Sequence, residues 1–488
     1  MNQPRPFDLQ TAARQSMLEH GFSPDLPAEA RQQVDAIVAH PPAVPGDSGV
    51  RDLRQLLWSS IDNDTSRDLD QVEWAERLPD GQARVLIGIA DVDSLVARNS
   101  PIDRYAATET TTVYTGVHNF SMLPEALSTG LTSLLEGQDR RGMVVEFTVD
   151  TQGQVSASQL YPAMIRNHAQ LAYNAVGAWL EGRGEPPPKV AASTDLQAQL
   201  KLQDNVAQCL RKARYQHGAL DIETIETHPV LVREQVVDIA TQQKNRATEL
   251  IEDFMIAANG VVARTLEQAK VTSIRRVVKT PKRWDRIVEL AAQLGTKLPE
   301  MPDSAALNEF LTQRRTADPD HFPDLSLAVV KLMGPGEYVI ERPGDAEQGH
   351  FGLAVQDYTH STAPNRRFAD LVTQRLIKAV EQHHASPYSD DELAAIAQNC
   401  TLKEDGARKV EREMQKRIAA VAMANRIGEN FDAIVTGVNQ YGSFVRVLRP
   451  HLEGMLVQGQ HGVDVGDRIP VTLVRTDPRR GFIDFARR

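Results

Sequence analysis

The sequence predicts an α+β protein with several domains, and three observations carry this prediction. The chain begins with a helical segment, continues with a mixture of strands and long helices, and ends with short alternating strands separated by Gly and Asp turns. Its 488 residues are enough for two to four domains with ample cores. We therefore expect a helical N-terminal region over 1–45, a mixed domain over 50–426 and a small β-barrel over 428–488.

The N-terminal region is expected to form two short helices. The first ends near Gly21, and the second opens with Ser23 and Pro24 and ends at two consecutive prolines. Such a pair forms either a helix-turn-helix-like cap or a simple packing appendage, and the appendage is the commoner case. The stretch PPAVPGDSG over 41–49 is typical of a linker.

The middle of the chain is expected to combine a sheet with surrounding helices. Residues 84–92 (RVLIGIADV) have the apolar content of a buried strand, and the Pro-Asp-Gly turn before them indicates a strand pair. Segments with few helix breakers follow. Helices are expected over 164–182, 195–216, 241–269, 367–381 and 390–426, with a strand pair over 217–230.

Composition restricts the class of protein. Two cysteines are too few for a disulfide framework, no apolar run reaches membrane-spanning length, and the N-terminus lacks a signal-peptide pattern, so we expect a cytoplasmic protein without a membrane partner. The net charge of −11 argues mildly against a wholly basic nucleic-acid-binding surface. Residues 431–488, however, hold eight arginines and six acidic residues, so a local basic surface is compatible with the sequence.

Four aspartates within nine residues form the most informative motif: Asp62, Asp64, Asp68 and Asp70. Carboxylates that lie close together repel each other unless a cation sits among them. The segment is therefore either a solvated acidic loop or a divalent-metal site. Apolar stretches on both sides place the aspartates where strands meet, which favours the metal site.

A calcium loop is an alternative, because EF-hand ligand positions 1, 3, 5, 7, 9 and 12 would fall on Asp62, Asp64, Ser66, Asp68, Asp70 and Glu73. The glycine that an EF-hand needs at position 6 is Arg67, and the downstream flank is predicted as strand rather than helix. Magnesium fits better, since it uses few carboxylates and takes other ligands from water and substrate phosphate.

A second motif, YTHSTAPNRRFADL from Tyr358, delivers Arg366 and Arg367 to the start of a predicted helix. The planar arginine fork suits phosphate, and a helix N-terminus also favours anions. Alone, two arginines are more often surface or ion-pair residues. Together with an acidic metal cluster they indicate a site for a phosphodiester.

With these motifs the chain resembles the RNase II / RNase R family of processive 3′-to-5′ exoribonucleases. The resemblance spans about 50 to 488 and rests on IDNDTSRDLDQ, GIADVDSLV, TTTVYTGVHNFSMLPEALS, ATELIEDFMIAAN and HFGLAVQDYTHSTAPNRRFADL, in this order. It implies a catalytic RNB domain with a central sheet or barrel and surrounding helices, followed by an OB-fold of the ribosomal-protein-S-one type. The two cold-shock domains that usually precede the RNB domain have no counterpart in the N-terminal fifty residues.

The resemblance also implies roles for particular residues. The metal-binding aspartates fall on Asp62, Asp68 and Asp70, the last two also being catalytic, and the catalytic arginine falls on Arg366. The family pattern has another aspartate where this chain has Gln71, whose carbonyl can ligate magnesium but brings no charge. Either the metal binds more weakly, or Asp64 or Glu73 supplies the missing charge, or activity is reduced. RNA contacts are implied for Tyr114, Tyr173, Glu252, Arg367 and Glu411.

The expected function is hydrolysis of single-stranded RNA to nucleoside 5′-monophosphates by a monomer with Mg²⁺, or alternatively Mn²⁺. Three alternatives remain open. The enzyme could be of the RNase R type that also degrades structured RNA, although a chain that stops just after the barrel without a basic tail favours the RNase II type. It could be an RNA-binding relative with reduced catalysis because of Gln71, or a calcium-binding structural protein.

Overall fold

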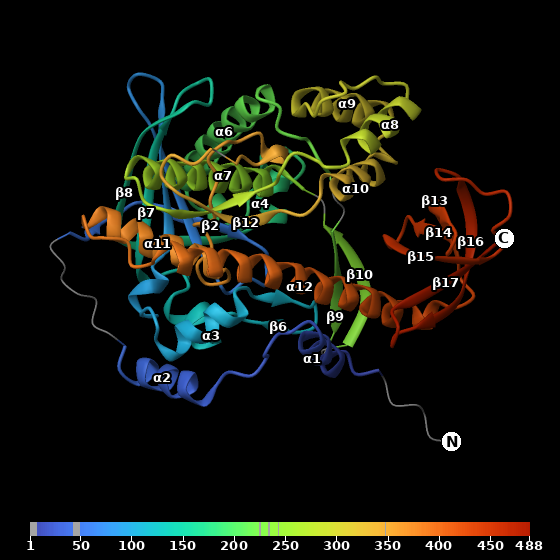
Figure 1. The fold of residues 1–488 in the computed structure, drawn as a ribbon, viewed down its shortest axis with the longest axis horizontal. Helices are drawn as coiled ribbons and strands as arrows, with labels where there is room; N and C mark the ends of the chain where they lie inside the picture. The colour runs from blue at the N-terminus through green and yellow to red at the C-terminus, as the bar shows by residue number, and fades with distance from the viewer. Residues whose placement is uncertain (1–6, 42–48, 224–225, 233–234, 243, 347) are drawn as a thin grey trace.

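A computed structural model describes residues 7–41, 49–223, 226–232, 235–242, 244–346 and 348–488. Helices and strands are mixed along the chain, and the α+β class is confirmed. The main sheet lies toward one end and a small barrel forms the other end, while the long helix α12 (Asp390–Met423) runs between them (Figure 1). The predicted linker over 41–49 lies almost entirely outside the described residues.

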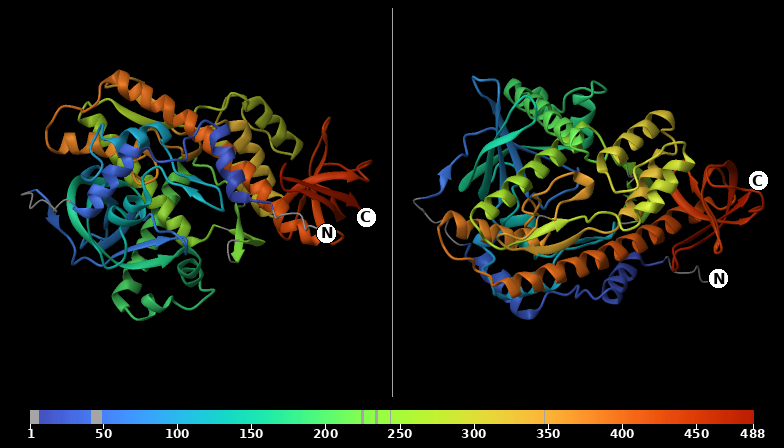
Figure 2. Two further views of the ribbon diagram at one scale, coloured as in Figure 1. Left: turned by 90° about the horizontal axis from the view of Figure 1, so that it is seen from below. Right: turned by 45° about the horizontal axis from the view of Figure 1, so that its top comes forward.

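The two N-terminal helices pack on different parts of the chain. Helix α1 (Leu9–Glu19) lies along α12, where Ser16 Oγ donates a hydrogen bond of 2.8 Å to Glu413. Helix α2 (Ala28–Ala39) packs against α3 (Pro101–Glu109). Both views of Figure 2 show α1 beside α12. The helices thus have the placement of packing appendages.

The main sheet has the strand order β1-β8-β2-β3-β4-β7. Strand β8 is long enough to pair with β7 through its first part and with β2 through its last part, so the sheet closes on itself. Its core is apolar, with Trp58, Leu86 and Phe147 fully buried. The strands are β1 (Arg51–Asp52), β2 (Trp58–Asp62), β3 (Gln71–Arg77), β4 (Ala83–Ala90), β7 (Asp139–Val149) and β8 (Val155–Ala172).

The helix predicted over 164–182 is wrong in its first half. Strand β8 continues to Ala172, and only then does α4 (Tyr173–Leu180) begin. Alternate side chains of this strand, from Ile165 to Leu171, are buried, which is the pattern of a strand with one face on a core. Pairing on both edges outweighs the helix propensity of the local sequence.

Helices pack against the main sheet and against each other. Helix α6 packs against α7 and against β3, and α7 also contacts α4 and α11. Two hydrogen bonds contribute to this packing: the side chain of Gln199 in α6 accepts from the backbone N–H of Ala75 and donates to its carbonyl. These helices are α5 (Pro188–Ala191), α6 (Thr194–Gln216), α7 (Arg246–Gln268) and α11 (Phe368–Glu381).

Smaller units project from this body. Helices α8 (Trp284–Gln293), α9 (Ser304–Ala317) and α10 (Phe322–Met333) share a small core of their own around Trp284 and Phe310. Three strand pairs complete the region: β5 (Val113–Tyr114) with β6 (Asn119–Phe120), β9 (Glu226–Val232) with β10 (Gln235–Gln242), and β11 (Ser273–Val277) with β12 (Glu337–Glu341). Short helical turns are η1 (Val92–Ser94), η2 (Leu127–Leu131), η3 (Phe351–Leu353) and η4 (Ala424–Arg426).

The C-terminal strands form a closed five-stranded barrel, as the alternating pattern predicts. The end of α12 packs into the barrel core through Ala420 and Met423. On another side, Arg446 of the barrel forms a 2.5 Å ion pair with Asp324 of α10. The strands are β13 (Asn430–Asn439), β14 (Gly442–Val447), β15 (Leu452–Gln458), β16 (Arg468–Asp477) and β17 (Phe482–Arg487).

A search of the described helices finds none that is long and apolar enough to cross a membrane.

Candidate active site

The four aspartates lie at and between the facing ends of β2 and β3. Asp62 is the last residue of β2, and Asp70 immediately precedes β3. Asp64 is exposed in the turn between the strands, so the four carboxylates do not share one point. Because strands rather than helices flank the segment, the EF-hand alternative is excluded.

Asp70 is held by the arginine loop. Its side chain is 1% exposed, and Arg366 Nε lies 3.1 Å from Oδ2. The backbone N–H of Asn365 donates a 2.9 Å hydrogen bond to Oδ1. Sequence positions separated by about three hundred residues therefore meet in one ion pair, and the Arg366 side chain remains 43% exposed for contact with a ligand.

Hydrogen bonds fix the loop that carries Arg366. Ser361 donates to Asn259 of α7 through both its backbone N–H and its hydroxyl group. The backbone N–H of Ala363 donates to Asp370 of α11 at 2.8 Å, and the Arg366 carbonyl accepts from the backbone of Thr112. The arginine thus projects from a loop tied to three separate elements.

Asp62 forms the other side of the site. Asp62 is paired with Ala172 at the end of the neighbouring parallel strand β8. Tyr173, which follows Ala172, is the first residue of α4. Gln71 is buried, and its side-chain amide donates a 3.3 Å hydrogen bond to Asp62 Oδ1. Asp62 Oδ2 is buried without a hydrogen-bond partner.

Burial dominates the electrostatics of these carboxylates. It raises the pKa of Asp70 to about 7, against the opposing effect of Arg366. It likewise raises the pKa of Asp62 to about 6, and the nearby Asp68 carboxylate adds to this increase. A site that raises carboxyl pKa values in this way favours the binding of a cation.

Tyr114 connects the aspartates with α12. Its hydroxyl group donates a 2.8 Å hydrogen bond to Asp68, and its backbone N–H donates a 3.1 Å hydrogen bond to Glu411. The side chain is 39% exposed, at the end of the short β5–β6 pair. The structure therefore brings together Tyr114, Glu411 and Asp68, which the sequence analysis had assigned to RNA and metal.

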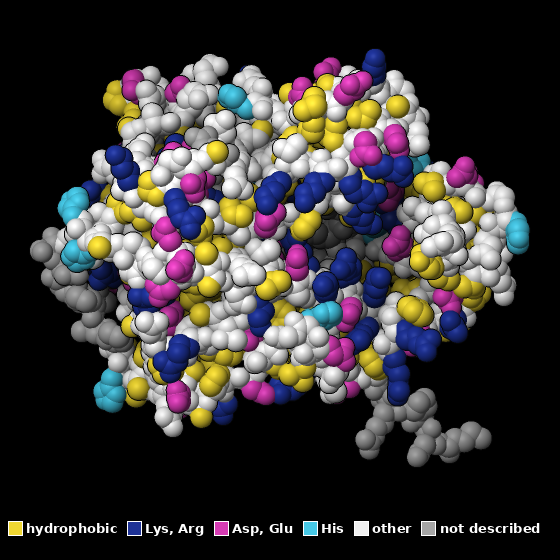
Figure 3. Space-filling view, viewed as in Figure 1, with side chains coloured by type: hydrophobic (Ala, Val, Ile, Leu, Met, Phe, Trp, Pro, Cys, Tyr) yellow, Lys and Arg dark blue, Asp and Glu magenta, His cyan; other side chains and the backbone are white. Residues whose placement is uncertain are grey.

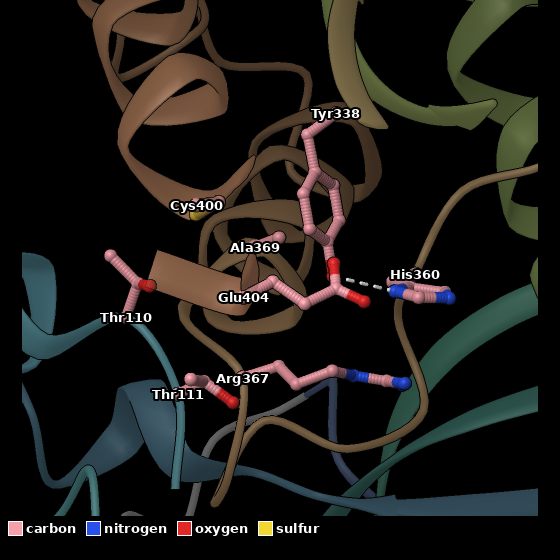
Figure 4. A pocket seen from close by; sticks show the side chains of 8 residues that line it. All are labelled: Thr110, Thr111, Tyr338, His360, Arg367, Ala369, Cys400 and Glu404. Atoms are coloured by element: carbon pink, nitrogen blue, oxygen red, sulfur yellow. Dashed lines mark hydrogen bonds between the residues drawn. The ribbon is translucent and has the colours of Figure 1, made fainter. Parts of the chain in front are cut away.

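Arg367 and Glu252, which are predicted to bind RNA, each form an ion pair with another side chain of this chain. Arg367 forms two hydrogen bonds with Asp370. It also lines a small cavity of about 110 Å³ together with Tyr338 and His360 (Figure 4). The Tyr338 hydroxyl group and the His360 ring are hydrogen-bonded to each other at 2.8 Å. Glu252 lies on α7 and forms a 2.8 Å ion pair with Lys244. Their roles in RNA binding stay predictions.

The donor set fits a divalent cation of the magnesium type, because carboxylate and amide oxygens are the ligands that magnesium prefers and Asp62 Oδ2 is buried without a partner. In the part of the chain that the structure describes, no three His, Cys, Asp or Glu side chains converge closely enough to hold a metal ion by themselves. The remaining ligands would come from Gln71, water and a substrate.

Asn365 and Asp370, which have no role predicted from the sequence, take part in the hydrogen bonds of the arginine loop. The position of Asp370, three residues after Arg367 in the first turn of a helix, was the available signal. From the sequence, Glu73 and Asp64 are the two residues that could supply the charge missing at Gln71. Glu73 is completely buried, and neither of its carboxylate oxygens has a hydrogen-bond partner.

The fold and the site define a class of protein with a closed sheet, an aspartate–arginine centre and a terminal barrel. Residues 50–383 match the family model described as "RNB domain", and residues 429–488 match "RNase II-type exonuclease C-terminal S1 domain". The chain belongs to the RNB family.

Its relatives include ribonuclease R proteins. The chain is 31% identical over 470 residues to ribonuclease R of Vibrio cholerae, covering 92% of this chain and 55% of the relative. It is 32% identical over 449 residues to ribonuclease R of Escherichia coli K12, covering 88% and 54%. The chain thus spans about half the length of the curated relatives it matches.

The fold is also that of a solved ribonuclease R. The structure of Mycoplasma genitalium RNase R in complex with ribose methylated single-stranded RNA superposes with a TM-score of 0.85 at 23% identity, covering 99% of this chain and 78% of that one.

Proposed function

We propose that this chain is a metal-dependent 3′-to-5′ exoribonuclease that hydrolyses single-stranded RNA to nucleoside 5′-monophosphates. The observation that carries the proposal is the ion pair between Arg366 and the buried Asp70, at the strand ends where Asp62 also lies. Membership of the RNB family supports it, because RNB-family nucleases are in general divalent-metal dependent.

The residues fit the steps of phosphodiester hydrolysis. Asp62, Asp68 and Asp70, with the amide oxygen of Gln71, would hold Mg²⁺ or Mn²⁺. Such an ion, when bound, supplies an activated water and neutralises charge on the phosphate. The half-exposed guanidinium group of Arg366 is available to donate hydrogen bonds to phosphate oxygens as negative charge develops on them.

The same arrangement suits an RNA 3′-end. Tyr114 offers an aromatic face for stacking on the terminal base, while its hydroxyl group is held by Asp68. Tyr173 follows Ala172, the residue that pairs with Asp62, and we propose that it contacts the sugar of the terminal nucleotide. Contacts of this kind with a 2′-hydroxyl would favour RNA over DNA.

A basic surface supports a single-stranded substrate. Lys and Arg side chains gather on the face between α10, α12 and the barrel (Figure 3). Positive charge on such a surface attracts the phosphate backbone of RNA, and this attraction weakens as the salt concentration rises.

We also propose that the chain is divided into an N-terminal region over 1–45, a catalytic domain over 50–426 and an RNA-binding barrel over 428–488.

A time course on a 5′-labelled 30-nucleotide RNA, with Mg²⁺, Mn²⁺ or chelator, tests the proposal. We expect the label to remain on progressively shorter products while nucleoside 5′-monophosphates accumulate, and we expect chelator to stop the reaction. The Asp70→Asn variant is the matched control for contaminating nuclease. An Asp70→Asn protein as active as wild type, or products shortened from the 5′-end, would refute the assignment.

The second candidate function is RNA binding without cleavage. Gln71 favours it, because a neutral amide stands where the family has a charged ligand. The same time course separates the two functions, since a pure binder would protect the RNA without shortening it. A hairpin with a 3′ overhang then distinguishes an enzyme restricted to single strands from one that also degrades structured RNA.

A further inference from the structure

Glu73 is a buried carboxyl group that the proposed mechanism leaves unused. It lies on β3, its relative exposure is 0%, and both of its carboxylate oxygens lack a hydrogen-bond partner. Burying a carboxylate without a partner is strongly unfavourable, and natural proteins rarely leave one in this state. Something other than the described side chains must therefore satisfy it, either a bound proton or a cation.

The position of Glu73 points to a cation. Residues 71 and 73 are two apart on one strand, so their side chains lie on the same face of β3. Gln71 on that face contacts Asp62, and the strand that carries Asp62, β2, pairs with β3 at Glu73. Both Glu73 and Asp62 thus have buried, unpartnered carboxylate oxygens on the two adjacent strands that meet at Gln71.

We propose that Glu73 is a ligand of the divalent ion in this chain and supplies the negative charge that Gln71 lacks. The inference rests on the proposed metal-dependent function. It adds a buried carboxylate on the strand next to that of Asp62 to the ligands proposed above, with the amide oxygen of Gln71, water and an RNA phosphate as further donors.

Asp64, the other acidic residue near the strand ends, does not have these properties. It lies in the exposed turn, where its carboxylate is accessible to water. Water can solvate an exposed aspartate without a cation, whereas a buried glutamate beside a second unpartnered carboxylate favours the binding of one. Asp64 therefore provides a matched control from the same segment of chain.

The test measures metal binding without RNA or activity. Free Mn²⁺ is titrated by electron paramagnetic resonance against the full chain, as wild type, Glu73→Gln, Asp64→Asn and the double variant Gln71→Asp/Glu73→Gln. We expect Glu73→Gln to raise the Mn²⁺ Kd by about tenfold or more, since even groups behind metal ligands alter affinity to this extent. Asp64→Asn should leave the Kd unchanged, and the double variant should restore it toward the wild-type value.

A melting curve in chelator separates ligation from a packing role. Because glutamine has the same shape without the charge, Glu73→Gln should melt no lower than wild type when metal is absent. A lower melting temperature in chelator, with an unchanged Mn²⁺ Kd, would overturn the proposal. So would wild-type protein that binds no Mn²⁺, or a double variant that remains as weak as Glu73→Gln.

The outcome is distinguishable from failure of the proposed function. If wild type degrades RNA and Glu73→Gln binds Mn²⁺ normally, the exoribonuclease assignment stands and the role of Glu73 is refuted. If Glu73→Gln loses Mn²⁺ affinity although wild type only protects RNA, Glu73 is a metal ligand in a chain that binds RNA without cutting it.

Discussion

Two buried carboxyl groups near the start of β3, those of Asp70 and Glu73, differ in whether the chain supplies them with hydrogen-bond partners. Asp70 receives a hydrogen bond from the backbone of Asn365 and an ion pair from Arg366. Glu73, three residues further on, receives none from any described side chain or backbone group. The chain therefore satisfies one carboxylate from within and leaves the other available for a group that binds from outside.

This difference indicates which residues depend on each other. The Asp70 side of the site is assembled by the chain alone, and it should be present before any ligand binds. The side with Asp62 and Glu73 carries unpartnered oxygens in a buried environment, and it should depend on solution conditions. Each experiment below perturbs one side and leaves the other as its reference.

The largest effect is expected for Arg366→Ala, on the side that the chain completes. Loss of a donor that stabilises developing charge typically costs about 2.7–4 kcal/mol, or about 100- to 1000-fold in rate. Single-turnover cleavage of labelled RNA measures this loss, with Arg366→Lys as a control that retains charge without the planar fork. A rate within a factor of about two of wild type would contradict the assigned role.

Tyr114→Ala should have the next largest effect, this time on RNA affinity. Removal of a base-stacking aromatic costs about 1–3 kcal/mol. Fluorescence anisotropy with a labelled single strand in chelator measures the affinity without turnover. Tyr114→Phe keeps the ring and loses only the hydrogen bond to Asp68, so it should bind nearly as well as wild type. Equal weakening in both variants would show that the hydroxyl group, and not the ring, provides the affinity.

Secondary structure that depends on local sequence could be predicted, whereas secondary structure that depends on tertiary pairing could not. The long helix over 390–426 could be predicted, because Ser389 and Glu392 form a capping box and few breakers follow. Strand β8 could not, since Asn167 and Ala169 on its buried face give a weak alternating signal. Its conformation is decided by pairing with β2 and β7, which one segment of sequence does not reveal.

The same distinction applies within the site. Asp62, Asp68, Asp70 and Arg366 could be proposed from motif spacing and resemblance, and the structure brings Asp70 and Arg366 into contact. The orientation of Arg367 toward Asp370 depends on the cavity behind it, and the pairing of Glu252 depends on a lysine outside its helix. The complete burial of Glu73 requires the packing of the surrounding layers, which spacing alone cannot supply.

A smaller effect is expected from pH, on the side of the site that the chain leaves incomplete. The folded-state pKa of Asp62, about 6, lies above the unfolded value of 3.8. This group therefore holds more protons when folded, and in chelator its contribution to stability falls as pH rises from about 4 to 6. Mg²⁺ competes with these protons, so its stabilising effect should be small at pH 5 and largest above pH 7.

Thermal melting with and without Mg²⁺ across this pH range provides the measurement. The difference between the two melting temperatures should grow by the equivalent of about 1.4 kcal/mol for each tenfold gain in Mg²⁺ affinity. Asp64→Asn serves as control and should follow the wild-type curve. A Mg²⁺ effect that is constant between pH 5 and pH 8 would contradict competition between protons and metal.

The smallest effect is expected for Asp64→Asn itself. Substitutions of exposed residues without specific contacts usually change the free energy of unfolding by less than about 0.5 kcal/mol. We expect activity, RNA affinity and stability all within that range of wild type. A loss of activity comparable to that of Asp70→Asn would show that the exposed turn closes over the substrate and that all four aspartates act together.

Helix α12 gives the molecule a fixed internal spacing. Its 34 residues correspond to about 50 Å, its far end enters the barrel core through Met423, and Glu411 within it holds the backbone of Tyr114. Twelve residues, or about 18 Å of helix, thus separate the contact with Tyr114 from the contact with the barrel core. An RNA that binds both places, as proposed above, would have to span a separation that this helix fixes.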